Sequence, residues 1–174
     1  MTPSLLQRTA LSALLLSVCA CSHMGHGPTA SSQLEARSGS TVSGTVTFMQ
    51  HGDHVMAKVD VSGLKPGQEH GFHIHDKGDC SAPDGTSAGG HFNPTGKPHG
   101  GQEVDHHGGD MPALKADAGG KASATFHLTG VTVVEGPASI VGRGIIVHKD
   151  PDDYKTQPTG NSGARVACGV IVKS

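Results

Sequence analysis

Alternation of apolar and polar residues is the strongest pattern in this sequence. It runs over residues 42–48 and again over residues 55–61, and the segment GLKPG follows at residues 63–67. Because the side chains of a β-strand point alternately to opposite faces, a period of two predicts a half-buried strand at each place. The Gly and Pro residues that follow predict a turn.

The same alternation returns in shorter pieces further along the chain. Residues 72–75 and 123–129 alternate in this way, and short β-branched runs cover residues 140–148 and 166–172. No long segment has a convincing period of 3.6 residues. The pattern predicts an all-β fold, a Greek-key β-sandwich or barrel of about eight antiparallel strands with immunoglobulin-like architecture. The 26 glycines and 3% aromatic residues agree with a compact β fold that has many turns.

Two long stretches do not fit a strand. Residues 76–122 are rich in Gly, Pro, His and Asp, and residues 149–165 are similar but shorter. Loops of this length are uncommon in compact domains unless they are functional. We therefore expect two long functional loops, held in place by a disulfide and by metal.

The N-terminus predicts a targeting segment. Arg8 precedes an apolar run over residues 11–18, which is too short to span a bilayer as a mature helix. The run ends in Val18-Cys19-Ala20-Cys21, which is similar to a bacterial lipoprotein cleavage box. Cys21 is the expected lipidated residue, because bulky Val18 directly before Cys19 makes Cys19 less suitable. Ordinary signal cleavage at the same place is the alternative.

The segment after this box is small, polar and aperiodic. Residues 22–38 therefore predict a flexible tether. His23, Met24 and His26 could bind metal there, or they could be incidental. The serine after Cys21 favours the outer membrane, so the expected location is the periplasm with a lipid anchor in the outer membrane. The expected organisation is a signal peptide at 1–20, a lipidated tether at 21–39 and one domain at 40–174.

Charge and cysteine content narrow the function further. Removing residues 1–20 leaves twelve basic and fifteen acidic residues, a net charge of −3, and no basic excess to suggest nucleic-acid binding. Cys80 and Cys168 are the cysteines that remain outside the cleavage box. In an oxidising envelope a lone pair is expected to form a disulfide, and two buried free thiols are the alternative.

The thirteen histidines include two sets whose spacing suits metal binding. His73 and His75 are two apart on an expected strand, so both rings point to one face while Phe72 and Ile74 point into the core. His148 ends the apolar run over residues 144–148 and enters the second loop.

The second set lies in the first long loop. His91, His99, His107 and Asp110 are spaced 8, 8 and 3 residues apart. Three nitrogens and one carboxylate oxygen make a plausible closed tetrahedral zinc site. On spacing alone His106 could replace His107, and a His-rich loop without metal is the alternative.

Six segments together resemble the copper/zinc superoxide dismutases, over about residues 40–173. They are GFHIH at 71–75, GDC at 78–80, SAGGHFNP at 87–94, HGGD at 107–110, GRGIIVH at 142–148 and GNSGARVACG at 160–169. Six motifs in the right order make the resemblance specific. It implies an enzyme that converts superoxide to oxygen and hydrogen peroxide, with one copper and one zinc per subunit.

The resemblance also implies the ligands. Copper would be bound by His73, His75, His91 and His148. Zinc would be bound by His91, His99, His107 and Asp110. His91 would then bridge both ions as an imidazolate, and it would take up a proton at its copper-side nitrogen when the bridge opens there during reduction. Four nitrogens suit the tetragonal preference of Cu(II), and three nitrogens with one oxygen suit zinc.

Further residues match the family in supporting roles. Asp152 would hydrogen-bond the far nitrogens of His73 and His99 and fix both rings. Arg165 matches the arginine beside the copper and would supply a fixed positive charge for the anion. Cys80 and Cys168 match the family disulfide. His70 fits a structural histidine rather than a ligand.

The sequence departs from some family members in its second loop, where only thirteen residues follow Asp152 up to Arg165. Lys77, Lys97 and Lys155 are candidates for steering superoxide, and the sequence does not choose among them. Partners expected beyond superoxide are the membrane, through the lipid anchor only, and a second copy in a homodimer. The rival interpretations are a metal-buffering lipoprotein and a structural β-sandwich with only a zinc clip.

Overall fold

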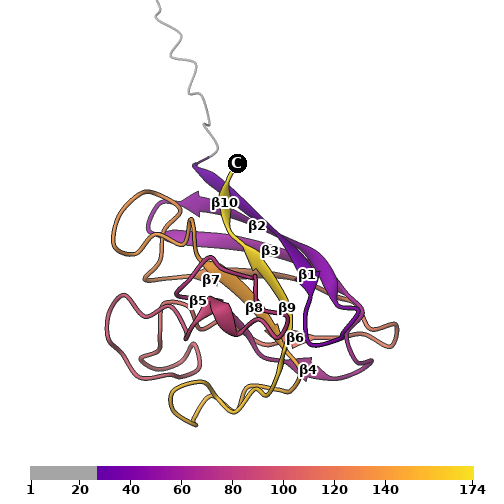
Figure 1. Ribbon diagram of the computed structural model, residues 1–174. Helices are drawn as coiled ribbons and strands as arrows, with labels where there is room; N and C mark the ends of the chain where they lie inside the picture. Colours follow the sequence, from indigo (N-terminus) through magenta and orange to yellow (C-terminus); the bar gives the residue numbers. More distant parts are fainter. Residues whose placement is uncertain (1–26) are drawn as a thin grey trace, which may run out of the picture.

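The computed structural model describes residues 27–174 (Figure 1). The expected signal peptide and the lipidation site at Cys21 lie outside the described residues. The strands are β1 (Thr29–Ala36), β2 (Ser43–His51), β3 (His54–Ser62), β4 (Glu69–His70), β5 (Phe72–His75), β6 (Leu114–Lys115), β7 (Ala122–Leu128), β8 (Gly144–His148), β9 (Arg165–Val170) and β10 (Val172–Lys173). One short 3-10 helix, η1, covers Thr86–Ala88. In this part of the chain no helix has the length and apolar character needed to cross a membrane.

Eight strands form one curled antiparallel sheet. Its order is β5-β8-β9-β1-β2-β3-β7, and β10 pairs with β1. β4 and β6 form a separate two-stranded sheet. Figure 1 shows both long loops on the side of β5, β8 and β9, away from β2 and β3. The expected all-β fold of about eight antiparallel strands is confirmed, and an immunoglobulin-like Greek key is consistent with this strand order.

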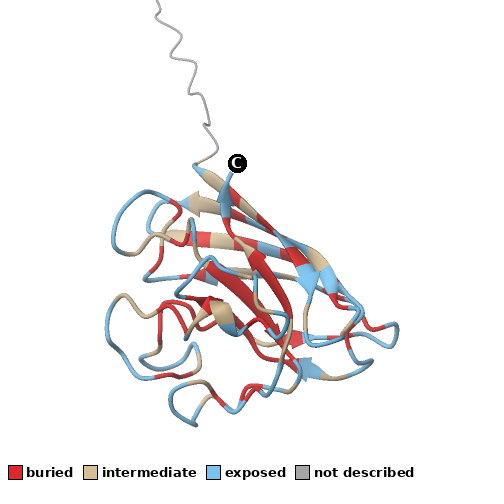
Figure 2. Ribbon diagram, in the orientation of Figure 1, coloured by how far each residue is buried: buried red, intermediate tan, exposed pale blue. Residues whose placement is uncertain are grey.

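The alternation found in the sequence explains which side chains form the core. Along β3 the burial alternates residue by residue, with Val55, Ala57, Val59 and Val61 buried and their neighbours more exposed. Phe72 and Ile74 of β5 enter the same core, as expected. Figure 2 shows the buried residues gathered between the two sides of the curled sheet. Burying each of the valine, isoleucine and phenylalanine side chains contributes roughly 1.5–3 kcal/mol in hydrophobic free energy.

The prediction of a flexible tether over residues 22–38 is wrong for residues 29–36. These residues form β1, which pairs with β2, β9 and β10 in the middle of the sheet. Ala30, Ser32 and Leu34 are buried and alternate with more exposed residues. The alternation was hidden because two of the three inward positions carry small side chains, and one of these is polar. The folded domain therefore begins before residue 40.

The first long loop is attached to the free edge of β5 by backbone hydrogen bonds. The Ile74 N–H donates to Gly109 O over 2.8 Å, and the Phe92 N–H donates to Ile74 O over 2.8 Å. Single bridges pair His75 with His91 and His73 with Asp110. The loop thus continues the sheet beyond β5 and brings its histidines beside those of the strand.

Candidate metal centre

Four histidines from three segments meet in one buried group. His73 and His75 come from β5, His148 ends β8, and His91 comes from the first long loop. The four have one ring nitrogen each within 4.8 Å of the others. β5 and β8 are paired in register, so two adjacent strands supply three of the rings. The structure therefore brings together the set expected to bind copper.

Hydrogen bonds fix the outer nitrogen of three of the four rings in this group. His73 Nε2 lies 2.6 Å from Asp152 Oδ2, His75 Nδ1 lies 2.9 Å from Gly89 O, and His148 Nδ1 lies 3.3 Å from Gly163 O. The other ring nitrogens, His73 Nδ1, His75 Nε2, His91 Nε2 and His148 Nε2, are buried and have no hydrogen-bond partner among the described residues. Four buried lone pairs without a partner are costly unless a cation binds them. The donor set fits a copper ion.

The second group surrounds one carboxylate oxygen. The Nδ1 atoms of His91, His99 and His107 lie 2.8, 3.0 and 3.3 Å from Asp110 Oδ1. Four ligand atoms each about 2.0–2.1 Å from a tetrahedral zinc would be about 3.3–3.4 Å apart, close to these separations. Of the same three nitrogens, those of His99 and His107 form no hydrogen bond within the described part of the chain. The donor set fits zinc.

The remaining oxygen of Asp110 is already occupied. Asp110 Oδ2 accepts hydrogen bonds from the backbone N–H groups of His107 and Gly100, over 3.0 and 3.2 Å. This leaves Oδ1 as the oxygen that faces the three rings. His106, the alternative to His107 on spacing alone, lies outside the group, and its Nδ1 is 2.7 Å from His107 O.

His91 belongs to both groups. Its Nδ1 faces Asp110, whereas its Nε2 is the atom without a partner in the four-histidine group. Its ring stacks on that of His73, with centroids 4.0 Å apart, and lies 5.2 Å from the ring of His99. One imidazole therefore presents its two nitrogens to two adjacent sites.

Asp152 connects the two groups a second time. Its Oδ2 lies 2.6 Å from His73 Nε2 and its Oδ1 lies 3.0 Å from His99 Nε2, so the hydrogen bonds expected from the sequence are confirmed. Gly160 leaves room for this carboxylate: it has φ +66°, and a Cβ there would collide with Asp152 Oδ1 and the ring of His99.

Burial keeps His73, His75 and His148 of the four-histidine group neutral. It lowers the pKa of His73 to about 4 and that of His148 to about 3, and it lowers the pKa of His75 well below its ordinary value. A neutral imidazole has the free lone pair that a metal needs. Around Asp110 the balance differs: burial lowers the pKa of His99, but the nearby carboxylates of Asp110 and Asp152 outweigh it and raise that pKa to about 9.

These shifts predict how the metal-free protein responds to acid. The pKa values of His73 and His148 in the folded protein lie below the unfolded value of 6.5. At a pH between the folded and unfolded pKa values, the unfolded chain therefore binds more protons than the folded protein. The free energy of unfolding should therefore fall as pH falls from about 6.5 towards 4, by at most about 1.4 kcal/mol per pH unit and histidine. Urea titrations of metal-free protein between pH 7 and pH 4 measure this slope. A stability that rises on acidification over this range would contradict the assignment.

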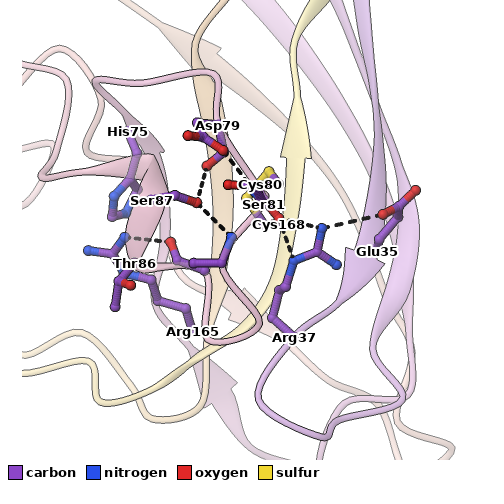
Figure 3. Close-up of a disulfide and its surroundings, with 12 residues drawn as sticks. Glu35, Arg37, His75, Asp79, Cys80, Ser81, Thr86, Ser87, Arg165 and Cys168 are labelled. Carbon is purple, nitrogen blue, oxygen red and sulfur yellow. Dashed lines mark hydrogen bonds and ion pairs between the residues drawn. A yellow bond between two sulfur atoms is a disulfide. The ribbon is translucent and has the colours of Figure 1, made fainter.

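The disulfide expected from the sequence is present. Cys80 of the first long loop is bonded to Cys168 of β9, with Cα atoms 5.8 Å apart. Figure 3 shows Arg37 and Arg165 on opposite sides of this disulfide. Arg37 donates to Cys80 O from Nε and Nη2, over 3.0 and 2.8 Å. The loop is thus tied to the sheet covalently and through Arg37.

Arg165 is positioned by the same loop. Its guanidinium donates from Nη1 to Gly85 O over 2.8 Å and from Nη2 to Gly89 O over 2.6 Å. Gly89 O is also the partner of His75 Nδ1. A single carbonyl therefore connects the guanidinium to a ring of the four-histidine group. Burial lowers the pKa of Arg165, but an arginine remains ionised.

Gln157 is a contributor that sequence reasoning missed. Its Oε1 accepts from the His99 N–H and its Nε2 donates to His99 O, both over 2.8 Å. The side-chain amide thus pairs with the backbone of a residue in the second group as a neighbouring strand would. Nothing in the spacing of a single Gln in a polar loop could have indicated this.

Replacing Gln157 with Ala should weaken zinc binding by about tenfold or more, since support around a ligand is typically worth 10–100-fold in affinity. Copper binding should change less, because the four-histidine group makes no contact with Gln157 in the hydrogen-bond network. Competition with a chromophoric zinc chelator measures the effect. Gln68→Ala is the matched control, because Gln68 donates to Lys149 O away from His99. Equal zinc affinity in both variants would show that the hydrogen bonds between Gln157 and His99 do not support zinc binding.

Comparison with known proteins agrees with this geometry. Residues 42–171 match the family model described as copper/zinc superoxide dismutase (SODC). A Superoxide dismutase [Cu-Zn] of Deinococcus radiodurans is 39% identical, over 92% of this chain and 93% of its own length. One from Paramecium bursaria Chlorella virus 1 is 44% identical, over 75% of this chain and 72% of its own.

A solved structure is similar as well. The crystal structure of a double mutant of a SOD-like protein from Bacillus subtilis superposes with a TM-score of 0.75 at 39% identity, and the match covers 82% of this chain and 96% of that one. The chain belongs to the copper/zinc superoxide dismutase family. It is an enzyme that converts superoxide to oxygen and hydrogen peroxide, and its cofactors are copper and zinc.

Proposed function

We propose that the enzyme performs this reaction at one copper and one zinc per chain, joined by His91, in a bacterial envelope. Copper would be held by His73, His75, His91 and His148. Zinc would be held by His91, His99, His107 and Asp110. The observation that carries this assignment is the position of His91, whose two ring nitrogens face two different groups of buried ligand atoms.

When bound, copper would supply the one-electron chemistry of dismutation, and zinc would hold the His91 ring and lower its pKa. The protein supplies the orientation and the proton. Asp152 holds His73 and His99 through their outer nitrogens, so the two groups keep their relative position. The Nε2 of His91 is the atom that can carry a proton for the departing peroxide, because Nδ1 is held at Asp110.

Arg165 attracts and orients the anion in this proposal. The mature chain has a net charge of −3, so superoxide must be drawn by a local positive field and not by the total charge. The guanidinium is held beside the four-histidine group by Gly85 O and Gly89 O and is only half-buried. The guanidinium donates to these carbonyls from Nη1 and Nη2, and it keeps its positive charge while doing so.

Replacing Arg165 with Gln should lower kcat/KM for superoxide by roughly tenfold or more, because the fixed charge beside the reacting centre is lost. The activity of the variant should also depend less on ionic strength. Arg165→Lys separates the two roles of the residue: it keeps the charge and loses the planar fork, so it should retain more activity. Pulse radiolysis of metal-loaded protein measures these rates. Equal rates in both variants and the parent would remove Arg165 from the mechanism.

We propose further that the mature protein is a periplasmic lipoprotein attached to the outer membrane through Cys21. The lipoprotein-like box at residues 18–21 supports the anchor, and the disulfide supports an oxidising compartment. Labelling with a radioactive fatty acid and separation of the membranes test this. Label that disappears in Cys21→Ala and persists in Cys19→Ala supports the proposal, whereas a soluble, unlabelled protein contradicts it.

A homodimer is the other association that we propose, on the resemblance to the family. Sedimentation velocity of the mature protein tests it, and a single monomeric species across micromolar concentrations would contradict it. Dimerisation is not needed for the ligand set, because every proposed ligand comes from one chain.

A further inference from the structure

The hairpin of β2 and β3 carries a second cluster of histidines, far from the proposed ligands in the strand order. We define the outer His–Met patch as five residues of β2, β3 and β7: Met49, His51, His54, Met56 and His127. In the sheet register His51 lies opposite His54, Met49 opposite Met56, and Met56 opposite His127. The neighbours Phe48, Val55 and Leu128 point into the core, so the patch side chains share the outer face.

The three imidazoles of the patch are in contact. The rings of His51 and His54 are stacked, with centroids 5.9 Å apart and planes 18° from parallel. The rings of His54 and His127 are 5.2 Å apart. His54 is therefore the central ring, and the Asp53 carboxylate lies 3.3 Å from its Nδ1. His51 and His127 are exposed, so their rings can turn towards one ion without disturbing the core.

Both methionines line a hollow on this face of the sheet, whereas none of the three histidines lines it. A cavity of about 340 Å³ opens on this face, and its walls include Met49, Met56 and Lys58. Met56 is opposite His127 and precedes Lys58 by two residues on the same face, so the thioethers lie between the histidines and the lysine. A cation would therefore bind at the hairpin end, beside Asp53, rather than at the end that carries Lys58.

The chemistry of the patch points to copper. Imidazole nitrogens suit divalent copper and zinc, and thioethers favour monovalent copper. Three imidazoles with two thioethers beside them can therefore bind copper in both oxidation states. We propose that the outer His–Met patch binds one copper ion in addition to the copper of the buried centre. None of its five residues belongs to either buried group, so the patch shares no residue with the proposed copper and zinc ligands.

The test uses the full mature protein with its buried copper and zinc sites already filled. Equilibrium dialysis against Cu²⁺ in a weakly competing buffer should give one further copper per chain. Its electron paramagnetic resonance spectrum should show coupling to imidazole nitrogen. His54→Gln should abolish this additional equivalent, and His51→Gln or His127→Gln should weaken it by about tenfold or more. The Met49→Leu/Met56→Leu variant should lose affinity for Cu⁺ more than for Cu²⁺.

Two controls make the result decisive. The His23→Gln/His26→Gln variant removes the histidines of the N-terminal segment and should keep the additional equivalent. Dismutase activity of the filled enzyme should be unchanged in every patch variant. The proposal is overturned if no additional copper binds, if the triple His51/His54/His127→Gln variant still binds it, or if the N-terminal variant loses it. If the parent protein itself lacked dismutase activity, that result would count against the function proposed for the buried centre and not against copper binding at the outer His–Met patch.

Discussion

Replacing His148 with Gln is expected to lower superoxide dismutase activity by more than about 100-fold, because the variant loses one of four nitrogens of the copper set. Contacts that only support a ligand are typically worth 10–100-fold, so removal of a ligand itself should cost at least as much. Zinc binding should persist, since His148 is not part of the group around Asp110. Metal analysis and activity should be measured on the same preparation.

His51→Gln is the matched control for this variant, because it removes an exposed histidine on the β2–β3 hairpin. It should retain full activity and full copper occupancy at the buried centre. If His148→Gln kept normal activity with normal copper, the four-histidine group would not be the redox site. Zinc lost together with copper would instead indicate that the variant disrupts both groups.

Removing the disulfide has the second large expected effect, this time on stability. Cys80 and Cys168 are 88 residues apart, and the chain-entropy model gives roughly 4–5 kcal/mol for a closed loop of that length. The Cys80→Ser/Cys168→Ser protein should unfold at lower urea concentration, and its Tm should fall by roughly 10–20 °C. Activity should fall as well, because the loop that carries Gly85 and Gly89 holds Arg165.

Arg37→Gln separates the covalent tie from the hydrogen bonds beside it. This variant removes both bonds to Cys80 O and leaves the disulfide intact. The free energy of unfolding of Arg37→Gln should be about 1–3 kcal/mol lower than that of the parent, because hydrogen bonds from a charged donor contribute about that amount. This loss is clearly smaller than the loss expected for the double serine variant. If the double serine variant were as stable as the parent, the disulfide would not be what holds the first loop.

Strands and ligands could be read from the sequence because each leaves a local signal. Alternation of large apolar residues marked β2 and β3, and the same alternation placed His73 and His75 together on one face of β5. The spacing in the first loop, together with the resemblance, gave the set around Asp110. The structure brings these residues together as expected.

Other features could not be read because their cause is not local. β1 buries Ala30, Ser32 and Leu34, whose small or polar members give only a weak alternation in the sequence. The strand is held in place by its pairing with β2 and β9 on either side. Spacing alone did not separate His107 from His106; the resemblance selected His107, and the structure shows its N–H donating to Asp110 Oδ2. The clamp between Gln157 and His99 joins residues 58 positions apart in two loops, which sequence periodicity cannot predict.

The most direct test of the account is a crystal structure of the metal-loaded enzyme with anomalous difference maps at the copper and zinc edges. The proposed role of His91 predicts two separate peaks on either side of its ring, with copper at the Nε2 side and zinc at the Nδ1 side beside Asp110. Zinc peaks at both positions in copper-replete protein would contradict this role of His91. A single metal peak that His91 does not contact would contradict it as well.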